Sequence, residues 1–214
     1  MKCDKVPSEQ EYDAAFAGRN SKVVNDKLKT ITVGVAGLGG LGSNVAMMLV
    51  RAGVKKFIIA DYDTVTLAHL NRQNYGFDHI GMSKVDATES ILLSVNPYLS
   101  IEKHVVKVTK ENAVELFGKC DAVCEAMDIS DEKSAFANMM VNKCPKVMIV
   151  SGSGMAGYGR SNSIKTKKSI KELYICGDRG DLEDRASIVL SPRANICAGH
   201  VANTIVALMM NGKV

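Results

Sequence analysis

Three glycines near the N-terminal third of the chain have a spacing that suits phosphate binding. Gly37, Gly39 and Gly42 fit the pattern Gly-x-Gly-x-x-Gly within the stretch GVAGLGGLGS. The first glycine of such a turn permits a tight bend, the second lets backbone N–H groups approach a phosphate, and the third lets a helix pack closely on a strand. The anion then lies at the positive N-terminus of that helix. We therefore predict a nucleotide site, the alternative being a packing turn without a ligand.

Charged side chains further along the chain help to distinguish which nucleotide the predicted site would bind. Asp61 follows the apolar stretch KKFIIA, and an acid there can hydrogen-bond the ribose of either NAD or ATP. The loop HLNRQNYG contains Asn71, Arg72 and Gln73, and Lys84 opens the next helical pattern. A pyrophosphate carries about two negative charges and a triphosphate about four, so a triphosphate benefits more from cationic side chains. Arg72 and Lys84 therefore favour a triphosphate, although each alone could be an ordinary surface charge.

Asp128 is the candidate metal ligand. It ends the stretch CDAVCEAMD, so we expect it at the carboxyl end of a strand, in the crevice where open α/β sheets bind ligands. Beside a triphosphate its carboxylate could hold Mg²⁺, which proteins bind through one or two carboxylates together with phosphate oxygens. Alternatively Asp128 caps the following helix, a role that Ser130 or Asp131 could fill equally well. Position alone leaves both interpretations open.

The cysteines and histidines give no metal or redox signature. The six cysteines form no C-x-x-C pair, and the four histidines have no metal-ligand spacing. Cys176 lies in a polar, flexible segment where a thiolate could be exposed, the alternative being an inert structural thiol. Cys197 and His200 share one helix face, but the surrounding apolar pattern favours the core. We predict no catalytic dyad.

The composition is that of one ordinary α/β domain. The chain has 214 residues, 46% of them hydrophobic and 23% charged, which is enough for a sizeable core. No apolar run approaches a membrane span and the first residues have no apolar export signal, so we expect a cytoplasmic protein without a membrane partner. The net charge of +4 and the single basic run KTKKSIK are too little for a nucleic-acid surface.

Strand and helix patterns alternate through the first three quarters of the chain. This alternation predicts an α/β fold with a Rossmann-like, doubly wound, mostly parallel sheet and helices on both faces. The expected strands cover residues 30–37, 55–61, 100–108, 120–128 and 146–157, and the expected helices cover residues 44–52, 84–97, 110–119 and 131–144.

The two ends of the chain depart from this alternation. Residues 1–29 are expected to form a helical lead-in. The apolar residues of 8–29 have helical spacing, and we expect a break at Gly18. Residues 157–191 are polar and rich in glycine, and we expect a loop-rich, strand-poor excursion over the ligand face that could hold one hairpin. Residues 192–214 predict a C-terminal helix.

Several ordered motifs resemble the ubiquitin-activating-type superfamily that includes ThiF and MoeB. They are GVAGLGGLGSNVA, ADYDTV, LNRQ, GMSKV, VNPYLSIE and EAMD, and the resemblance runs from about residue 8 to 214. The stretches SGMAGYG, SNSIKT and YICGD are similar to the zinc-free branch known as ThiF family 2. The resemblance implies one adenylation domain over residues 1–214. It would use ATP to adenylate the C-terminal glycine carboxylate of a ubiquitin-like sulfur carrier ending in Gly-Gly, in thiamine biosynthesis, and release pyrophosphate.

The resemblance also assigns roles to individual residues. Arg72 and Lys84 would face the phosphates, Asp128 would position Mg²⁺, and Arg19 would reach the ATP of the partner subunit in a homodimer. The other residues implied to bind ATP are Gly37, Gly39, Gly40, Leu41, Gly42, Asp61, Asp63, Asn71 and Gln73.

This sequence departs from the family pattern at three positions. Leu173 stands where the first cysteine of a zinc-binding pair would align with Cys176, so no zinc is expected. His69 replaces the first asparagine of N-L-N-R-Q, which leaves the role of that position open. Some relatives link a cysteine covalently to the carrier, and Cys176 is the position to suspect here.

Other functions remain open at this point. Within the same class, the acceptor could be the molybdopterin carrier or a small peptide. From another class, an NAD-dependent oxidoreductase could use the same glycine turn, although Arg72, Lys84 and the lack of a hydride-transfer acid or base disfavour it. A third alternative is a catalytically inactive partner subunit that binds a carrier without activating it.

Overall fold

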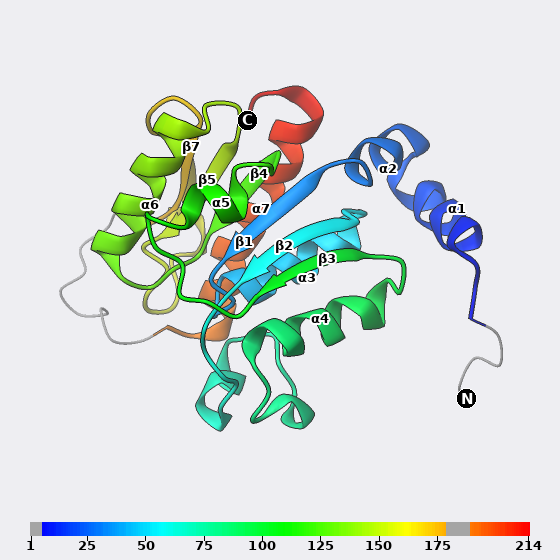
Figure 1. Cartoon of the computed structure of the whole chain (residues 1–214), viewed down its shortest axis with the longest axis horizontal. Helices are drawn as coiled ribbons and strands as arrows, with labels where there is room; N and C mark the ends of the chain where they lie inside the picture. Colours follow the sequence, from blue (N-terminus) through cyan, green and yellow to red (C-terminus); the bar gives the residue numbers. More distant parts are fainter. Residues whose placement is uncertain (1–5, 179–188) are drawn as a thin grey trace.

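A seven-stranded sheet with the order β3-β2-β1-β4-β5-β7-β6 organises the chain (Figure 1). The computed structural model describes residues 6–178 and 189–214. Neighbouring strands are parallel except for the antiparallel pair β6 and β7, which confirms the predicted Rossmann-like, mostly parallel sheet. The strands are β1 (Thr32–Ala36), β2 (Lys56–Ala60), β3 (Ser100–His104), β4 (Ala122–Glu125), β5 (Met148–Ser153), β6 (Lys165–Lys168) and β7 (Leu173–Gly177).

Helices cover both faces of the sheet, because the side chains of its strands alternate between two apolar layers. In β4, for example, Ala122 and Cys124 join one core cluster and Val123 joins the other. No helix of residues 6–178 and 189–214 has the length and apolar character to cross a membrane. One face is covered by α3 (Gly42–Ala52), α4 (Lys84–Val95) and α7 (Ser191–Asn211), and the other by α5 (Ala113–Phe117) and α6 (Ser130–Lys143).

The carboxyl ends of the central strands define a binding crevice. Ala36 at the end of β1 is in register with Ala60 of β2 and with Glu125 of β4. The turns after these three strands therefore begin at one edge of the sheet. Because α3 and α6 then leave toward opposite faces, a crevice opens between β1 and β4, which is where open α/β sheets bind their ligands.

The N-terminal segment is helical, as predicted, but its break lies elsewhere. Helix α1 (Glu9–Asn20) contains Gly18, and α2 (Lys22–Leu28) follows directly. The break is at Ser21, whose φ is 69° and whose hydroxyl accepts the Val24 N–H to cap α2. A helix-capping serine therefore ends one helix and starts the next, whereas the glycine is tolerated inside α1.

The region expected to be a strand-poor excursion contributes two strands to the sheet. Strands β6 and β7 form the hairpin, but β7 also pairs in parallel with β5, so this part extends the sheet rather than crossing over the ligand face. The short apolar run LYIC suffices for a strand because Leu173, Tyr174 and Cys176 are buried on the two faces of the sheet. The rest of the expected excursion includes residues 179–188, which lie outside the described residues.

Candidate active site

The glycine turn leads from the carboxyl end of β1 into the N-terminus of α3. Gly37 has a φ of 92°, and a Cβ there would lie 2.8 Å from the Ala126 carbonyl oxygen. A Cβ on Gly42 would lie 1.9 Å from the Gly37 oxygen, whereas one on Gly39 would meet nothing closer than 3.9 Å. No side chain caps the N-terminus of α3. The turn therefore suits an anion, which the free N–H groups and the helix dipole both favour.

A pocket beside this turn collects side chains from four separate segments. The sequence-predicted residues that line it are Gly37, Gly39, Asp61, Asp63, Lys84 and Asp128. Residues that were not predicted also line it, among them Tyr62, Val108 and Met127. The topology therefore brings the predicted acids and one predicted cation to one site.

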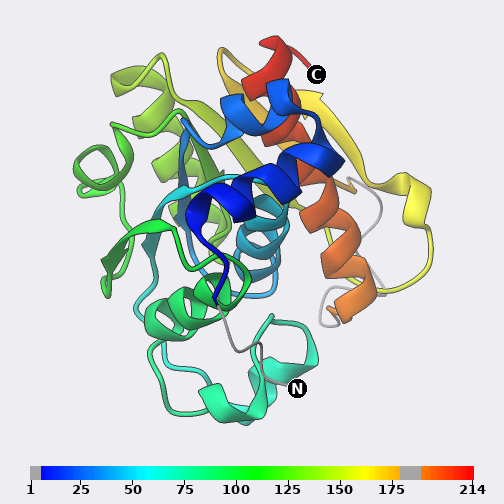
Figure 2. The same ribbon diagram turned by 90° about the vertical axis from the view of Figure 1, so that its right-hand side faces the viewer.

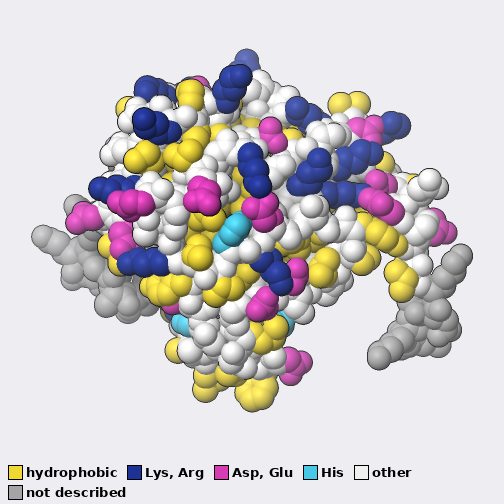
Figure 3. Space-filling view, in the orientation of Figure 1, with side chains coloured by type: hydrophobic (Ala, Val, Ile, Leu, Met, Phe, Trp, Pro, Cys, Tyr) yellow, Lys and Arg dark blue, Asp and Glu magenta, His cyan; other side chains and the backbone are white. Residues whose placement is uncertain are grey.

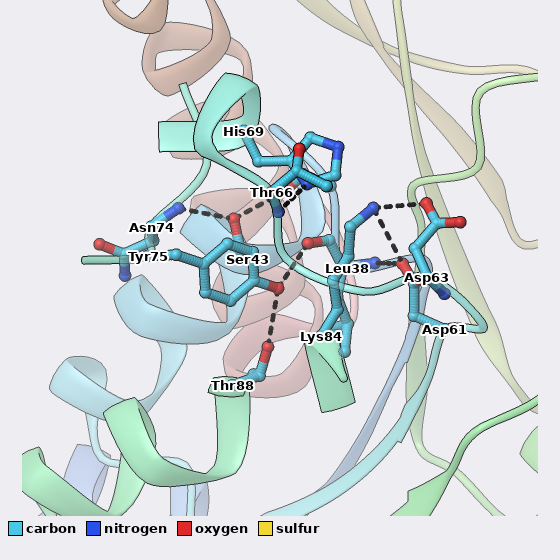
Figure 4. Close-up of polar contacts among 11 residues, drawn as sticks. Leu38, Ser43, Asp61, Asp63, Thr66, His69, Asn74, Tyr75, Lys84 and Thr88 are labelled. Carbon is cyan, nitrogen blue, oxygen red and sulfur yellow. Dashed lines mark hydrogen bonds and ion pairs between the residues drawn. The ribbon is translucent and has the colours of Figure 1, made fainter. Parts of the chain in front are cut away.

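The acid–lysine cluster in this pocket is held in a fixed arrangement (Figure 4). The Asp61 carboxylate accepts the Leu38 N–H at 2.6 Å and the Asp63 N–H at 2.8 Å. The Lys84 ammonium lies 2.6 Å from the Asp63 carboxylate and 3.9 Å from that of Asp61. Lys84 and Asp61 are only 4% and 7% exposed. Because an ammonium has three donors, Lys84 can hold Asp63 and still donate to a ligand oxygen.

A network of hydrogen bonds ties the loop after β2 to the glycine turn (Figure 4). The Ser43 hydroxyl donates to the Gly39 carbonyl at 2.7 Å and accepts the Asn74 N–H at 3.0 Å. The Asn44 amide donates to the carbonyls of both Gly40 and Arg72. The Tyr75 hydroxyl donates to the Leu38 carbonyl at 2.7 Å. The start of α3 thus fixes where residues 71–75 lie.

Arg72 and Gln73 lie against the glycine turn, and these two residues and Asn71 are outside the lining of the pocket. The aliphatic part of Arg72 packs on Gly40, and its guanidinium donates to the Asn71 side chain at 2.9 Å. Gln73 is 7% exposed, and its Oε1 has no hydrogen-bond partner among the described residues. A buried unpaired carbonyl oxygen is costly, so it fits a site that a donor from a ligand or water completes.

Leu41 serves the core, in contrast to the other residues assigned to ATP. Its side chain is 3% exposed and packs against Gly152 of β5, where a Cβ would lie 2.2 Å from a Leu41 methyl carbon. Only the backbone of Leu41, at the N-cap of α3, is available to a ligand.

Asp128 lines the pocket, but it does not end a strand as predicted. The last ladder hydrogen bond of β4 runs from the Ala126 N–H to the Ala36 carbonyl, and the next N–H, that of Met127, turns to the Glu125 carboxylate. β4 therefore ends at Glu125, and Asp128 is an exposed loop residue. The capping alternative is also wrong, because Ile129 is the N-cap of α6 and no side chain caps that helix.

The acids of the pocket could bind a magnesium ion only together with oxygen atoms of a bound ligand. Within residues 6–178 and 189–214, no three His, Cys, Asp or Glu side chains come together as a metal site. Mg²⁺ is usually bound by one or two carboxylates and substrate phosphates, with waters completing the shell. Asp128 beside a phosphate-binding turn meets that description.

Arg19 lies outside the pocket of its own chain. It occupies the last turn of α1 and is exposed to solvent. Its role at the site of a partner subunit stays a prediction.

Two charged residues of the pocket were missed by the sequence analysis. Lys107 and Glu132 line it, and their side chains form an ion pair of 2.7 Å between the segment after β3 and helix α6. No sequence signal singled out Lys107, because residues 100–108 were expected to form one strand. Instead β3 ends at His104, and the following residues turn toward the pocket, where Val108 and Met127 are apolar lining residues.

Cys176 is a buried thiol, contrary to the exposure considered for it. It lies in β7, 0% exposed, with Thr166 and Thr204 as hydrogen-bonding neighbours of its sulfur. Burial raises the pKa of Cys176, and burial raises the pKa of Cys197 to about 12. Both side chains are therefore neutral thiols at physiological pH, and the core assignment of Cys197 is confirmed.

His69 has a local structural role. Its Nδ1 accepts the Thr66 N–H at 3.0 Å and so caps the 3₁₀ helix η1 (Leu67–Asn71) (Figure 4). Burial, followed by the nearby Lys84 charge, lowers the pKa of His69 and so favours the neutral ring, which can accept a hydrogen bond at Nδ1. The substitution of histidine for asparagine is thus compatible with an intact loop.

An exposed apolar surface lies on the segment between β2 and α4. This segment forms the lower end of the molecule in Figures 1 and 2, and Figure 3 shows hydrophobic side chains gathered there. Leu67, Phe77 and Ile80 are 67%, 76% and 39% exposed. Clustered apolar exposure of this kind is typical of a protein interface.

Comparison with known sequences reveals the relatives of this chain. Residues 12–213 match the model of the ThiF family. Ubiquitin-like modifier-activating enzyme 5 of Caenorhabditis elegans is 34% identical over 161 residues, which cover 69% of this chain and 38% of that protein. The Xenopus laevis enzyme of the same name is 43% identical over 107 residues, covering 49% and 27%. The matched regions therefore span less than two fifths of these relatives.

Solved structures share the fold. The E. coli tRNA N6-threonylcarbamoyladenosine dehydratase TcdA, in complex with ATP, superposes with a TM-score of 0.85 at 18% identity, covering 97% of this chain and 98% of that one. E. coli MccB in complex with AMPCPP and MccA gives a TM-score of 0.68 at 18% identity, covering 97% and 65%. At this level of identity the similarity establishes the fold alone.

Proposed function

The chain belongs to the ThiF family, and from that premise we propose that it is an adenylyltransferase acting on the C-terminal carboxylate of a small ubiquitin-like carrier protein. The observation that carries the proposal is the pocket in which a phosphate-binding turn, the buried Lys84 and Asp128 meet. An enzyme that binds only the pyrophosphate of a dinucleotide needs neither a cation such as Lys84 nor a further acid such as Asp128.

The proposed reaction suits the residues that are present. A carboxylate oxygen of the carrier attacks the α-phosphorus of ATP, the bond from that phosphorus to the oxygen bridging to the β-phosphorus breaks, and pyrophosphate leaves with that oxygen. The nucleophile is already an anion, so no general base is needed. The turn N–H groups and Lys84 stabilise charge on the phosphates, and the pocket holds the two reactants in line.

ATP can be placed by the chemistry of the pocket walls. The ribose would lie at Asp61, whose oxygens retain lone pairs beyond those used by Leu38 and Asp63. The base would lie against the apolar surface of Val108 and Met127, and the phosphates would extend over the glycine turn. Mg²⁺, held by Asp128 and phosphate oxygens, would neutralise charge on the triphosphate.

The finer assignment is a sulfur carrier of thiamine biosynthesis ending in Gly-Gly. It is supported by the sequence motifs shared with the zinc-free branch of the family. The molybdopterin carrier and a small peptide are the alternative acceptors. A homodimer in which Arg19 reaches the partner's ATP is part of the proposal, and the exposed Leu67, Phe77 and Ile80 support an interface between subunits.

Nucleotide binding distinguishes the proposal from redox chemistry. Isothermal titration of the protein with Mg²⁺ and ATP, and separately with NADH, is expected to show ATP binding at least about 10-fold more tightly, because only ATP uses both the cation and the metal-binding acid. Tighter binding of NADH would refute the proposal. The same titration with carriers ending in Gly-Gly, and with a peptide, identifies the acceptor.

The Lys107–Glu132 pair is expected to make a small contribution to ATP binding. We expect Lys107→Ala to weaken ATP binding about two- to fivefold with little change in kcat, because a partly exposed ion pair contributes at most about 1 kcal/mol. Titration calorimetry and initial rates measure the two effects. The control is Lys119→Ala, which breaks a similar pair with Glu102 outside the pocket. A loss of kcat above about 10-fold would show that Lys107 acts on the reaction itself.

A further inference from the structure

Glu125 is a fully buried carboxylate at the end of β4 that the proposed reaction does not use. It is 0% exposed. Its oxygens accept hydrogen bonds from the Ser151 hydroxyl, from the Met127 N–H at 2.8 Å and from the Lys133 ammonium at 2.9 Å. A buried charge is costly to maintain, so this one is retained together with a complete set of partners.

Glu125 and Lys133 together bind both backbone groups, the N–H and the carbonyl, of one residue in the loop that follows β4. Glu125 accepts the N–H of Met127, and Lys133, from the first turns of α6, donates to the carbonyl of the same Met127 at 2.9 Å. The ammonium of Lys133 therefore joins the end of the strand, the loop and the helix. The next residue in the loop is Asp128.

The same stretch of backbone is a wall of the nucleotide pocket. Ala126, Met127 and Asp128 all line the pocket. The position that a Cβ on Gly37 would occupy is 2.8 Å from the Ala126 carbonyl oxygen and 3.3 Å from the Met127 nitrogen. The loop and the glycine turn are thus in close contact, and a shift of one displaces Asp128 relative to the other.

We propose that Lys133 and Glu125 are positioning residues that fix Asp128 opposite the glycine turn. The inference rests on the proposed function, in which Asp128 acts on the triphosphate. Within residues 6–178 and 189–214 no side-chain hydrogen bond or ion pair holds the exposed Asp128, so in this part of the chain the Met127 peptide is what sets its place. Loss of the pair leaves Asp61, Lys84 and the glycine turn in place, loosens Met127 in the wall proposed for the base, and displaces the carboxylate that acts during phosphoryl transfer.

The consequence is a specific split between binding and catalysis. We expect Lys133→Met to lower kcat about 10- to 100-fold, because a misplacement of about 1 Å at a reacting group can cost a factor of this size. ATP affinity measured without Mg²⁺ should fall less than about fivefold, because Asp61, Lys84 and the glycine turn still hold the ribose and phosphates while only the Met127 part of the base wall is loosened. Lys133→Arg keeps the charge and several donors, so we expect it to retain most of the activity.

The experiment combines turnover with a measurement that needs no turnover. Hydrogen–deuterium exchange of the segment 126–129 reports directly on the loop, and we expect faster exchange in Lys133→Met than in the unaltered protein or in Lys133→Arg. Because an unpaired buried Glu125 can unfold the chain, the double variant Glu125→Gln/Lys133→Met, which removes both charges, is measured alongside. Lys119→Met, which breaks a surface pair with Glu102, is the matched control.

Each outcome bears on a different claim. Faster exchange in the segment 126–129, together with a loss of kcat that exceeds the loss of ATP affinity, supports the inference. Unchanged exchange in the segment, or an equal loss of kcat in Lys119→Met, overturns it while leaving the proposed function in place. If the unaltered protein activates no carrier, the proposed function fails, and the deuterium measurement still decides whether the pair holds the loop.

Discussion

Replacing Asp128 with alanine is expected to lower carrier-dependent pyrophosphate exchange at least about 100-fold, since an electrostatic group aimed at developing charge typically contributes this much. Backbone N–H groups and Lys84 bind Asp61 and Asp63, and Lys107 pairs with Glu132, whereas the described part of the chain places no such partner on the Asp128 carboxylate. It is therefore the carboxylate that can take part in binding a metal on the triphosphate. Exchange of labelled pyrophosphate into ATP measures the effect.

The matched control for this change is Asp131→Ala. Asp131 is also an exposed acid, three residues further on in the first turn of α6, and it does not line the pocket. We expect its removal to change exchange less than about twofold, the usual range for a surface substitution. Similar losses in both variants, or full activity of Asp128→Ala, would remove Asp128 from the mechanism.

Lys84→Met is expected to weaken ATP binding about 100-fold. Hydrogen bonds to charged groups contribute about 1.5–3 kcal/mol each, and the change also leaves Asp61 and Asp63 beside the phosphates without their cation. ATP titration measures the loss of affinity. Circular dichroism shows whether the variant stays folded, because Lys84 is 4% exposed and its removal also costs stability.

Lys103→Met separates this effect from the general loss of an ion pair. Lys103 also bridges two acids, Asp86 and Glu89, but it lies outside the pocket and is more exposed. We expect ATP affinity to be unchanged in this variant. If Lys103→Met weakened ATP binding as much as Lys84→Met does, the effect would reflect stability and not phosphate contact.

Local patterns predicted the central part of this molecule well. The β-branched run before Gly37 and the apolar run before Asp61 predict parallel strands, and parallel strands end at a common edge. That reasoning correctly places Asp61 beside the glycine turn, and Asp128 lines the same pocket, although it does so from the loop after β4 and not from the strand end that was predicted. The loop around Arg72 contacts the glycine turn through Ser43 and Asn44, which were not singled out, and a role of Arg72 at the phosphates stays a prediction.

Other features depend on tertiary contacts that no local pattern carries. β4 ends at Glu125 because the Met127 N–H finds a carboxylate in place of a strand neighbour. The run LYIC becomes a sheet strand because β5 offers it a free edge, and this buries Cys176. The Glu125–Lys133 pair spans eight residues and two elements, and it resembles an ordinary surface pair until the structure shows its burial.

The most direct test of the account is ATP–pyrophosphate exchange with and without a carrier protein. The account predicts exchange only when Mg²⁺, ATP and a ubiquitin-like carrier ending in Gly-Gly are all present, and loss of that exchange when the terminal glycine of the carrier is removed. Exchange that persists without any carrier, or no exchange with any member of a carrier and peptide panel, would contradict it.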